Sequence, residues 1–449
     1  MLDNLSAWAR WCLFWLLLPN VLVILMWPIG GPPMGGTILI VGVLAILFSR
    51  LRSLALRRIA VLGLLLFSSF QYVLSAFNLE SLRADALLQF AQHTRPMESA
   101  TYMAAALALG IAAGVSMHGI ASAPRLGRSV QMLIGLAATM LFAGADTFAT
   151  AATSNSYQRL PADNRPVLSA TMEAGLLQPR ADRRNTVIIV VEALGVPTDA
   201  DAVRQFRADW LRPEWQQRYD IRHGKVRFFG STTNAALREL CLAYADVADF
   251  DFAKSSCLPR RYDGAGYETI GIHAFESGFF ERSTWWPELG FKQLAFGPDL
   301  IRQGARPCGG MWPGACDVDI AGIIGQRLKT AKRPQFVYWV TLNSHLPVLD
   351  GATPNLGGCA EGTAPLANKS LLECRLFLAH HDLADAISRL VLDPRLPPTD
   401  FLIVGDHMPP FLNRRERLDF DGYNVPWIYL RSSDQPGRRS PQGLQRIAG

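Results

Sequence analysis

The stretch Asn185–Gly195 reads N-T-V-I-I-V-V-E-A-L-G, and it decides the fold class of the C-terminal part of this 449-residue chain. Its run of apolar, mostly β-branched residues favours a strand that is covered on both faces, as in parallel sheets between helices. The run stops at Glu192, so a carboxylate directly follows the strand. Ligands of parallel sheets gather beyond the carboxyl ends of the strands. Glu192 therefore predicts a functional site at that edge.

Further apolar runs of strand length follow, and stretches with helical periodicity separate them. The expected strands are 187–191, 268–273, 336–342, 401–404 and 425–430, and the longest expected helix is 369–392. Strands that alternate with helices predict an α/β sandwich around a mostly parallel sheet. Two more strands lead into polar residues, because 401–404 runs into Asp406 and His407, and 336–342 runs toward His345.

The first third of the chain is different, because its long apolar runs contain almost no charge. A bilayer core of about 30 Å needs about 20 apolar residues in a helix. Five segments are expected to span a membrane: 8–27, 36–49, 59–77, 100–118 and 129–150. The expected division of the chain is a five-helix transmembrane domain at 1–150, a linker and interfacial segment at 151–184, and a catalytic domain at 185–449.

Arginines in the short loops predict the orientation in the membrane. The loops 50–58 and 119–128 are rich in arginine, whereas 28–35 has no charge. Positive loops stay in the cytoplasm, so five spans would put the N-terminus inside and the C-terminal domain outside. The segment 79–93 mixes leucines with charges, which fits either an amphipathic helix on the membrane surface or an ordinary solvated loop.

The cysteines indicate the redox compartment. Six of the seven lie in the C-terminal part, and an even number outside the membrane predicts three disulfides in an oxidising compartment. Proximity favours the pairs 308–316, 359–374 and 241–257, although sequence alone does not determine the pairing; zinc ligation, the competing interpretation, lacks a C-x-x-C pair. The formal net charge of +6 is scattered, with no basic stripe, so nucleic acid is not an expected partner.

Six short motifs occur along the chain in a definite order. They are N-T-V-I-I-V-V-E-A-L-G (185–195), G-S-T-T-N-A-A-L-R-E-L-C (230–241), G-Y-E-T-I-G-I-H-A-F (266–275), F-F-E-R (279–282), L-N-S-H-L-P (342–347) and V-G-D-H (404–407). This order resembles that of lipoteichoic acid synthases and of phosphoethanolamine transferases, which share the alkaline phosphatase and sulfatase superfamily. The resemblance implies a sulfatase-like α/β/α catalytic domain behind a helical anchor. It also implies a multi-pass protein of the inner, or cytoplasmic, membrane, with the catalytic domain in the periplasm or outside the cell.

The resemblance also assigns a metal site. Its ligands are matched by Glu192, Thr232, Asp406 and His407. Two acids and one histidine, completed by a hydroxyl oxygen, suit one divalent ion, Zn²⁺ or Mn²⁺. Thr232 matches the nucleophile, with Thr233 and Ser231 as the alternatives. In the resembled families an acid usually stands four positions after the nucleophile, and Ala236 stands there in this chain.

Five further residues have weaker signals. Arg282 resembles the residue that holds the phosphate, and His345 the one that contacts the head-group, where it would protonate a leaving alkoxide or deprotonate an incoming hydroxyl. Without the motif order, a surface ion pair and a strand-end cap would be the simpler interpretations. His273 is expected to line the same pocket or to pack beside the sheet. His380, like its neighbour His381, is interpreted as structural.

The segment Cys257–Arg261 spells C-x-P-x-R, the signature of sulfatases whose cysteine becomes formylglycine. Sulfatases pair it with adjacent aspartates after the first strand, whereas a lone Glu192 follows that strand here, so formylglycine chemistry is disfavoured. The motif G-D-H-M-P-P (405–410) and the lack of any later histidine favour the phosphoglycerol branch of the resembled families without excluding ethanolamine.

The leading hypothesis is a two-step transfer. Thr232 would attack phosphatidylglycerol or phosphatidylethanolamine, release diacylglycerol, and hold the head-group as phosphothreonine until a hydroxyl of an envelope or secreted glycan accepts it. A membrane-tethered sulfatase or phosphodiesterase, acting on an envelope polysaccharide or lipid with water as acceptor, is the first alternative. An inactive scaffold in polysaccharide assembly is the second.

Overall fold

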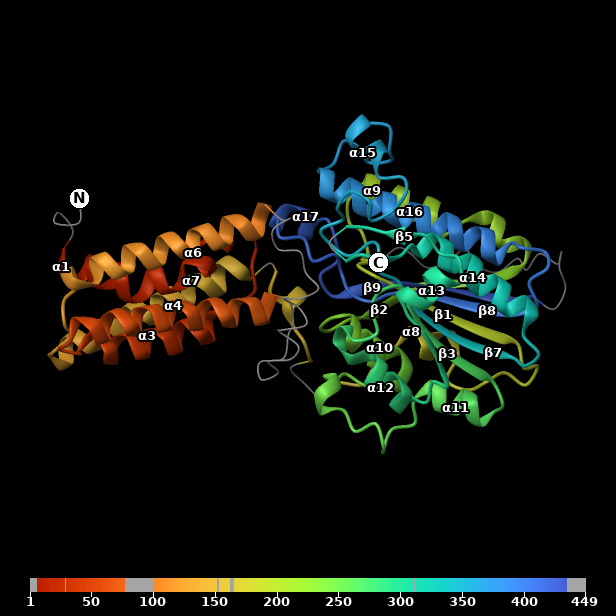
Figure 1. Cartoon of the computed structure of the whole chain (residues 1–449), viewed down its shortest axis with the longest axis horizontal. Helices are drawn as coiled ribbons and strands as arrows, with labels where there is room; N and C mark the ends of the chain where they lie inside the picture. Colours follow the sequence, from red (N-terminus) through yellow and green to blue (C-terminus); the bar gives the residue numbers. More distant parts are fainter. Residues whose placement is uncertain are drawn as a thin grey trace. The chain divides into compact units, whose positions relative to one another are not determined.

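The computed structural model of the chain describes residues 6–28, 30–76, 100–151, 153–161, 165–310 and 312–433. It divides into two compact units, Met1–Tyr157 with Leu412–Arg415, and Gln158–Phe411 with Glu416–Gly449. The first unit is a bundle of helices, and the second holds the sheet (Figure 1). The expected surface segment 79–93 lies outside the described residues.

Among its described residues, the helical unit contains four stretches that are long and apolar enough to cross a membrane. They are Ala7–Met26, Leu54–Ala76, Tyr102–Ser122 and Ser129–Thr150. The first combines α1 (Ala7–Trp11), η2 (Cys12–Leu17), η3 (Leu18–Asn20) and α2 (Val21–Met26), and the others contain α4 (Leu54–Ala76), α6 (Ala100–Gly119) with η5 (Ile120–Ser122), and α7 (Ser129–Thr150). The described helices of this unit also include α3 (Gly35–Ser49) and η6 (Ser154–Tyr157).

The expectation of five spans was wrong for the segment 36–49. It forms α3, which has 15 residues and is therefore about 22 Å long, short of a bilayer core. The prolines at 32 and 33 precede the helix, and its N-terminus is capped by a carboxylate from α7. Oδ2 of Asp146 accepts a hydrogen bond from the amide of Met34 at 2.7 Å. This buried hydrogen bond fixes the start of α3, which is shorter than the four candidate spans.

Arginines from three segments gather at one end of the helical unit. Arg10 donates to the carbonyl of Ser122 at 2.9 Å, Arg57 to that of Ala123 at 2.7 Å, and Arg125 to that of Arg52 at 2.9 Å. The first two of these acceptors lie at the end of the α6–η5 helix, where positive charge is favourable. The loops 50–58 and 119–128 therefore share one end. Asp146 lies at the opposite end of the helical unit, because α3 begins beside Asp146 and ends at Arg50.

The second unit is built on a seven-stranded sheet with the order β2-β9-β8-β1-β7-β3-β4. The strands are β1 (Asn185–Val191), β2 (Tyr219–Arg227), β3 (Glu268–His273), β4 (Gln293–Ala295), β7 (Gln335–Val340), β8 (Thr399–Gly405) and β9 (Asn424–Ser432). The strands from β8 to β4 pair in parallel, whereas β9 pairs antiparallel with both β8 and β2. The mostly parallel sheet is confirmed, and β1 is buried along its whole length.

Helices cover both faces of this sheet. The helices after residue 157 are α8 (Ala170–Ala174), α9 (Ala200–Trp210), α10 (Thr232–Cys241), α11 (Leu258–Gly264), α12 (Arg282–Leu289), α13 (Gly297–Arg302), α14 (Asp317–Thr330), α15 (Gly357–Glu361), α16 (Leu371–Val391) and α17 (Arg414–Leu418), with short turns η7 (Pro213–Gln217), η8 (Val247–Asp249) and η9 (Phe279–Glu281). Figure 1 shows α9, α14 and α16 over one face and α10, α11 and α12 over the other. The unit is therefore an α/β/α sandwich.

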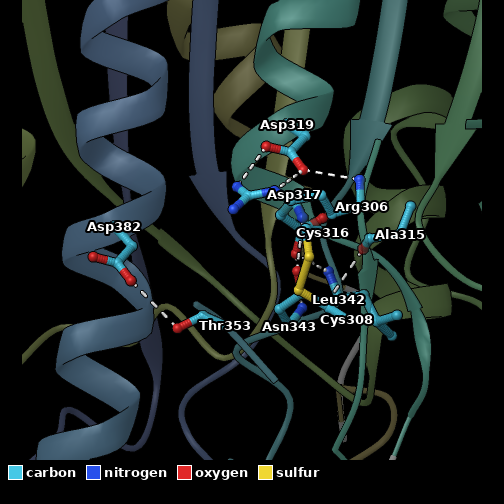
Figure 2. Close-up of a disulfide and its surroundings, with 10 residues drawn as sticks. All are labelled: Arg306, Cys308, Ala315, Cys316, Asp317, Asp319, Leu342, Asn343, Thr353 and Asp382. Carbon is cyan, nitrogen blue, oxygen red and sulfur yellow. Dashed lines mark hydrogen bonds and ion pairs between the residues drawn. A yellow bond between two sulfur atoms is a disulfide. The ribbon is translucent and has the colours of Figure 1, made fainter. Parts of the chain in front are cut away.

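Three disulfides stabilise the sheet unit. They join Cys241 with Cys257, Cys308 with Cys316, and Cys359 with Cys374, which confirms the pairs that proximity favoured; Figure 2 shows the second. The bonded Cys257 has no thiol to convert to formylglycine. The C-x-P-x-R segment instead starts a helix, because Cys257 is the N-cap of α11 and Pro259 lies in its first turn.

Candidate active site and metal centre

Three potential metal ligands meet at the carboxyl ends of two neighbouring strands. Glu192 follows β1, and Asp406 and His407 follow β8, whose last residue pairs with the last residue of β1. Each of the three side chains offers one ligand atom within 4.8 Å of the others. Glu192 and Asp406 are buried, and His407 is half-buried. The parallel register of β1 and β8 therefore brings these residues together, although more than 200 positions separate them in the sequence.

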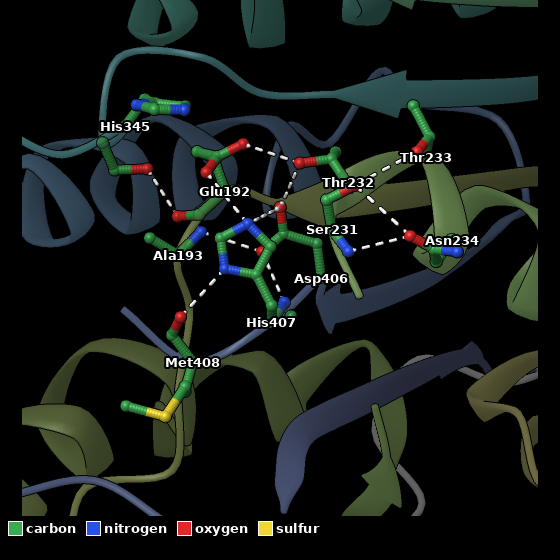
Figure 3. A network of polar contacts seen from close by, with 12 residues as sticks. Glu192, Ala193, Ser231, Thr232, Thr233, Asn234, His345, Asp406, His407 and Met408 are labelled. Atoms are coloured by element: carbon green, nitrogen blue, oxygen red, sulfur yellow. Dashed lines mark hydrogen bonds and ion pairs between the residues drawn. The ribbon is translucent and has the colours of Figure 1, made fainter. Parts of the chain in front are cut away.

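Thr232 completes the cluster (Figure 3). Its Oγ1 lies 2.9 Å from Oδ2 of Asp406 and 3.2 Å from Oε2 of Glu192. Nε2 of His407 lies 3.3 Å from Oδ2 of Asp406 and 3.4 Å from Oε1 of Glu192. Neighbouring ligand atoms of a tetrahedral ion with bonds of about 2.1 Å stand about 3.4 Å apart. The four side chains are therefore spaced as ligands of one ion.

The burial and charge of the carboxylates at this place fit a cation. Oε1 of Glu192 is buried and has no hydrogen-bond partner among the described residues. Burial, together with the charge of Glu192, raises the pKa of Asp406 to about 7. Burial alone would lower the pKa of His407, but the two carboxylates outweigh it and raise that pKa. A divalent cation would neutralise this concentration of negative charge, so the donor set and its burial fit Zn²⁺ or Mn²⁺.

The backbone around the cluster leaves one oxygen of Asp406 for the site. Oδ1 accepts hydrogen bonds from the amides of Ala193 at 2.8 Å and His407 at 2.7 Å, so Oδ2 alone faces Thr232. Ala193 has φ of 55°, a left-handed conformation that costs a non-glycine residue about 1 kcal/mol and is typical of functional sites. At Gly405 an added Cβ would collide with the carbonyl oxygen of Leu194, so this close approach requires glycine.

Three side chains that the sequence did not single out as positioning groups hold Glu192. Its amide donates to Oγ1 of Thr341 at 2.9 Å, and its carbonyl accepts from Oγ of Ser344 at 2.7 Å and Nε2 of His380 at 3.0 Å. Burial lowers the pKa of His380 to about 4, so its ring is neutral and donates one N–H. The only sequence signal was a histidine on the buried face of the long helix, which does not reveal its partner.

Arg238 is a further residue that sequence reasoning missed. It is 1% exposed, and its guanidinium donates to the carbonyls of Gly405 at 2.9 Å and Asp406 at 3.2 Å, and to Glu239 at 2.7 Å. These bonds tie α10, which begins with Thr232, to the end of β8. The adjacent arginine and glutamate in the motif at 230–241 were the available signal, because a buried arginine needs such partners.

Thr232 is the first residue of α10, and Ser231 is its N-cap. Ser231 and Thr233 bond to each other through their hydroxyls at 3.1 Å, whereas Thr232 bonds to both carboxylates. Within the described ranges no residue accepts a hydrogen bond from the amides of Thr232 and Thr233. Free amides at the positive end of a helix favour an anion there. The start of α10 therefore combines a hydroxyl that contacts two carboxylates with amides that suit an anion.

Arg282 is buried, so the simpler interpretation as a surface ion pair is wrong. Its guanidinium lies over the rings of Phe279 and Phe280 at 5.8 and 5.5 Å, and no carboxylate among the described residues forms an ion pair with it. Burial lowers its pKa to about 10, so it remains charged at neutral pH. Phe280 and Glu281 both have φ of 51°, which is strained for such residues. A buried cation behind a strained turn suits an anionic ligand.

The two other predicted histidines lie near this cation. His273 ends β3; its Nδ1 bonds to the carbonyl of Val340 at 3.1 Å, and its Nε2 is buried with no partner among the described residues. Burial, and then the charge of Arg282, lowers the pKa of His273 well below its usual value. His345 is half-buried beside the cluster (Figure 3), and burial lowers its pKa to about 4. His381 instead bonds to Asp209 at 2.6 Å, outside the cluster.

No protein-family model matches this chain, and a search of curated proteins finds no match. Solved structures do match. One is the integral membrane lipooligosaccharide phosphoethanolamine transferase A (EptA) from Neisseria meningitidis, at 14% identity, with 95% of this chain and 88% of that chain covered and a TM-score of 0.46. Another is the lipoteichoic acid synthase LtaP from Listeria monocytogenes, at 14% identity, 60% and 72% coverage and a TM-score of 0.40.

A third match is the periplasmic domain of EcEptC from Escherichia coli in complex with Zn, at 13% identity, 56% and 73% coverage and a TM-score of 0.38. All three TM-scores are below 0.5, so the function has to be inferred from the site itself. Two of these structures, a lipoteichoic acid synthase and a phosphoethanolamine transferase, are of the kinds that the motifs of this chain resemble.

Proposed function

We propose that this chain is a metal-dependent transferase that moves a phospholipid head-group, phosphoglycerol or phosphoethanolamine, to an envelope or secreted glycan. The head-group would pass through a phosphothreonine at Thr232. One observation carries the proposal: the hydroxyl of Thr232 stands 2.9 and 3.2 Å from two buried carboxylates that, with His407, are spaced for one ion. A hydroxyl has no structural need for such a place, whereas an activated nucleophile does.

The residues that would hold the ion are Glu192, Thr232, Asp406 and His407. A bound Zn²⁺ or Mn²⁺ would lower the pKa of the threonine hydroxyl and offset charge on the phosphoryl oxygens. The hydroxyl of Thr232 would lose its proton, with Oδ2 of Asp406 as the acceptor within reach at 2.9 Å. In the first step its oxygen bonds to phosphorus while the bond to diacylglycerol breaks, and the leaving oxygen takes up a proton.

In the second step a glycan hydroxyl bonds to the same phosphorus while the bond to Thr232 breaks, and the proton that the glycan hydroxyl loses passes to the oxygen of Thr232. Arg282 would hold the non-bridging oxygens through both steps, because it is a buried cation without a carboxylate partner among the described residues. The amides at the start of α10 would stabilise the same charge. His345 and His273 would line the pocket for the head-group, next to Arg282.

We also propose that residues 1–150 anchor the enzyme in the inner membrane, that 151–184 form the linker, and that 185–449 act on the non-cytoplasmic side. The arginine loops share one end of the helical unit, which fits a cytoplasmic position for both loops. The three disulfides fit an oxidising compartment. Anchoring would raise the effective concentration of a phospholipid donor at the site.

Intact-mass measurement of the full-length chain tests the proposal. Incubation with phosphatidylglycerol or phosphatidylethanolamine should add one phosphoglycerol or phosphoethanolamine, and peptide mapping should place it on Thr232. The variant Thr232→Ala should lose the adduct. The matched control Thr233→Ala should keep it. An adduct on Thr232→Ala would refute the assignment. Label released only as free head-group would indicate a phosphodiesterase, and a chain without metal or adduct would indicate a scaffold.

A further inference from the structure

The loop 308–316 carries one tryptophan to the edge of the candidate active site. β5 (Pro307–Cys308) and β6 (Gly314–Ala315) form a two-stranded hairpin, which the disulfide between Cys308 and Cys316 closes (Figure 2). Trp312 lies within this loop and is 6% exposed. Its ring packs against those of Phe275 and Phe279, with centroids 5.8 and 4.8 Å apart. The disulfide and the two rings restrict how the indole can turn.

One carboxylate joins this hairpin to the segment that carries His345. Asp317 begins α14 directly after the disulfide, and its Oδ2 accepts hydrogen bonds from the amides of Leu342 at 2.8 Å and Asn343 at 2.7 Å. The amide of Asp317 donates back to Oδ1 of Asn343 at 2.7 Å (Figure 2). Asn343 stands two residues before His345. The hydrogen bonds of Asp317 and Asn343 therefore connect the hairpin to the segment that carries His345.

The indole of Trp312 contacts His345 directly. Its Nε1 lies 3.0 Å from Nδ1 of His345, and the ring centroids are 5.1 Å apart. An indole N–H can only donate a hydrogen bond, so this contact requires an Nδ1 without a proton. A neutral imidazole with a bare Nδ1 carries its proton on Nε2.

A second contact at the same nitrogen opposes this arrangement. The carbonyl oxygen of Leu346 lies 2.8 Å from Nδ1 of His345, and it would need an N–H there. One nitrogen cannot serve both partners at once. The indole cannot accept, so it would face another donor at 3.0 Å, whereas a carbonyl with two lone pairs tolerates an unmade bond more easily. The contact with Trp312 therefore decides which tautomer is favoured.

We propose that Trp312 is a positioning residue that holds His345 with its proton on Nε2, so that the ring enters the reaction as a hydrogen-bond donor. The inference rests on the proposed function for the acceptor, which is an oxygen of the phosphoryl group or of the alkoxide that leaves it. It also revises the expected role, because a ring in this tautomer has no lone pair on Nε2 with which to take a proton from an incoming hydroxyl. The other tautomer would turn that lone pair toward the phosphate oxygens and repel them.

The substitution Trp312→Phe tests this in the full-length chain, because it keeps an aromatic ring and removes the donor. With ¹⁵N-labelled histidine, wild-type His345 should show a protonated Nε2 and a bare Nδ1, assigned by the signals that His345→Gln loses. In Trp312→Phe the proton should move to Nδ1, which would then donate a hydrogen bond to the carbonyl oxygen of Leu346. The kcat for head-group transfer should fall about tenfold, the effect of one hydrogen bond, with little change in KM for the phospholipid.

Trp215→Phe is the matched control. Trp215 is also buried and donates its indole N–H, but to Oγ of Ser388 on α16 at 2.9 Å. This variant should leave the His345 signals and kcat unchanged. Loss of the hairpin disulfide in Cys308→Ala with Cys316→Ala should shift the His345 signals as Trp312→Phe does. Loss of the disulfide at α15 and α16, in Cys359→Ala with Cys374→Ala, should not.

Two results would overturn the positioning role: a wild-type His345 that carries its proton on Nδ1, or a Trp312→Phe chain in which the tautomer stays the same. The proposed function fails separately. A chain that shows the Nε2 proton, loses it in Trp312→Phe and transfers no head-group would support the positioning role and contradict the transferase. A chain that transfers the head-group with His345 protonated on Nδ1 would support the transferase and contradict the positioning role.

Discussion

At the scale of single residues, the two oxygens of Asp406 have different partners. Oδ1 is held by two amides, and Oδ2 is left to Thr232 and His407. Burial and the nearby charge of Glu192 raise the pKa of Asp406 to about 7, so the two carboxylates are poorly stabilised by the chain alone. Two buried carboxylates this close together are unfavourable without a cation, and their oxygens are spaced to bind one. We therefore expect metal binding to depend on both carboxylates.

The substitution Glu192→Gln tests that dependence. Its amide keeps the shape of the side chain but removes one negative charge from the four-ligand set, so the purified protein should lose its zinc or manganese. Transfer should fall at least about 100-fold. Metal content is measured by elemental analysis of the protein, and folding by its thermal unfolding. Glu288→Gln, at an exposed glutamate on α12, is the control. Full metal occupancy in Glu192→Gln would contradict the assignment of this ligand.

At the scale of elements, the strands that carry the site could be predicted from the sequence, and the edges of the sheet could not. β1 and β8 are continuous apolar runs because both faces are covered. β2 pairs only with β9, at the edge, and its sequence Y-D-I-R-H-G-K-V-R is largely polar, so no apolar run marks it. Contacts between elements were also hidden, because a sequence shows that His380 is on a helix but not that it reaches the carbonyl of Glu192.

The join between α14 and β7 has its own pH dependence. Burial raises the pKa of Asp317 to about 7, although its Oδ2 accepts two amide hydrogen bonds. An aspartate of the unfolded chain titrates near 3.9. Between these two values the folded chain binds the proton and the unfolded chain does not, so stability falls as the pH rises through this window. The upper limit of the loss is about 4 kcal/mol, from about three pH units at 1.36 kcal/mol each.

The substitution Asp317→Asn should remove this part of the pH dependence, because the amide cannot ionise and its oxygen can still accept a hydrogen bond. The unfolding midpoint of the purified chain should fall between pH 5 and pH 8, and it should fall less in the variant. Asp319→Asn, next to the same hairpin but paired with Arg306 and partly exposed, controls for a general charge effect. Equal slopes in the wild type and in Asp317→Asn would show that Asp317 is ionised throughout the window.

At the scale of the whole molecule, the orientation of the anchor decides which compartment the site faces. Five spans were expected, and the described part of the chain has four candidate spans, with α3 as a shorter apolar helix. The expectation that survives is electrostatic, because the loops 50–58 and 119–128 meet at one end through their arginines. Positive loops at one end of a bundle favour the cytoplasmic side. The three disulfides of the other unit point to the opposite compartment.

Single cysteines at two exposed glycines separate the two possible orientations. Gly127 lies in an arginine loop and Gly264 at the end of α11, and an added Cβ meets nothing within 4 Å at either position. Cys12→Ala removes the only free cysteine, and the six others are bonded. In cells with a permeabilised outer membrane, an impermeant maleimide should label Gly264→Cys and spare Gly127→Cys, whereas a permeant maleimide should label both. The opposite pattern would put the catalytic domain in the cytoplasm, where its disulfides would be reduced.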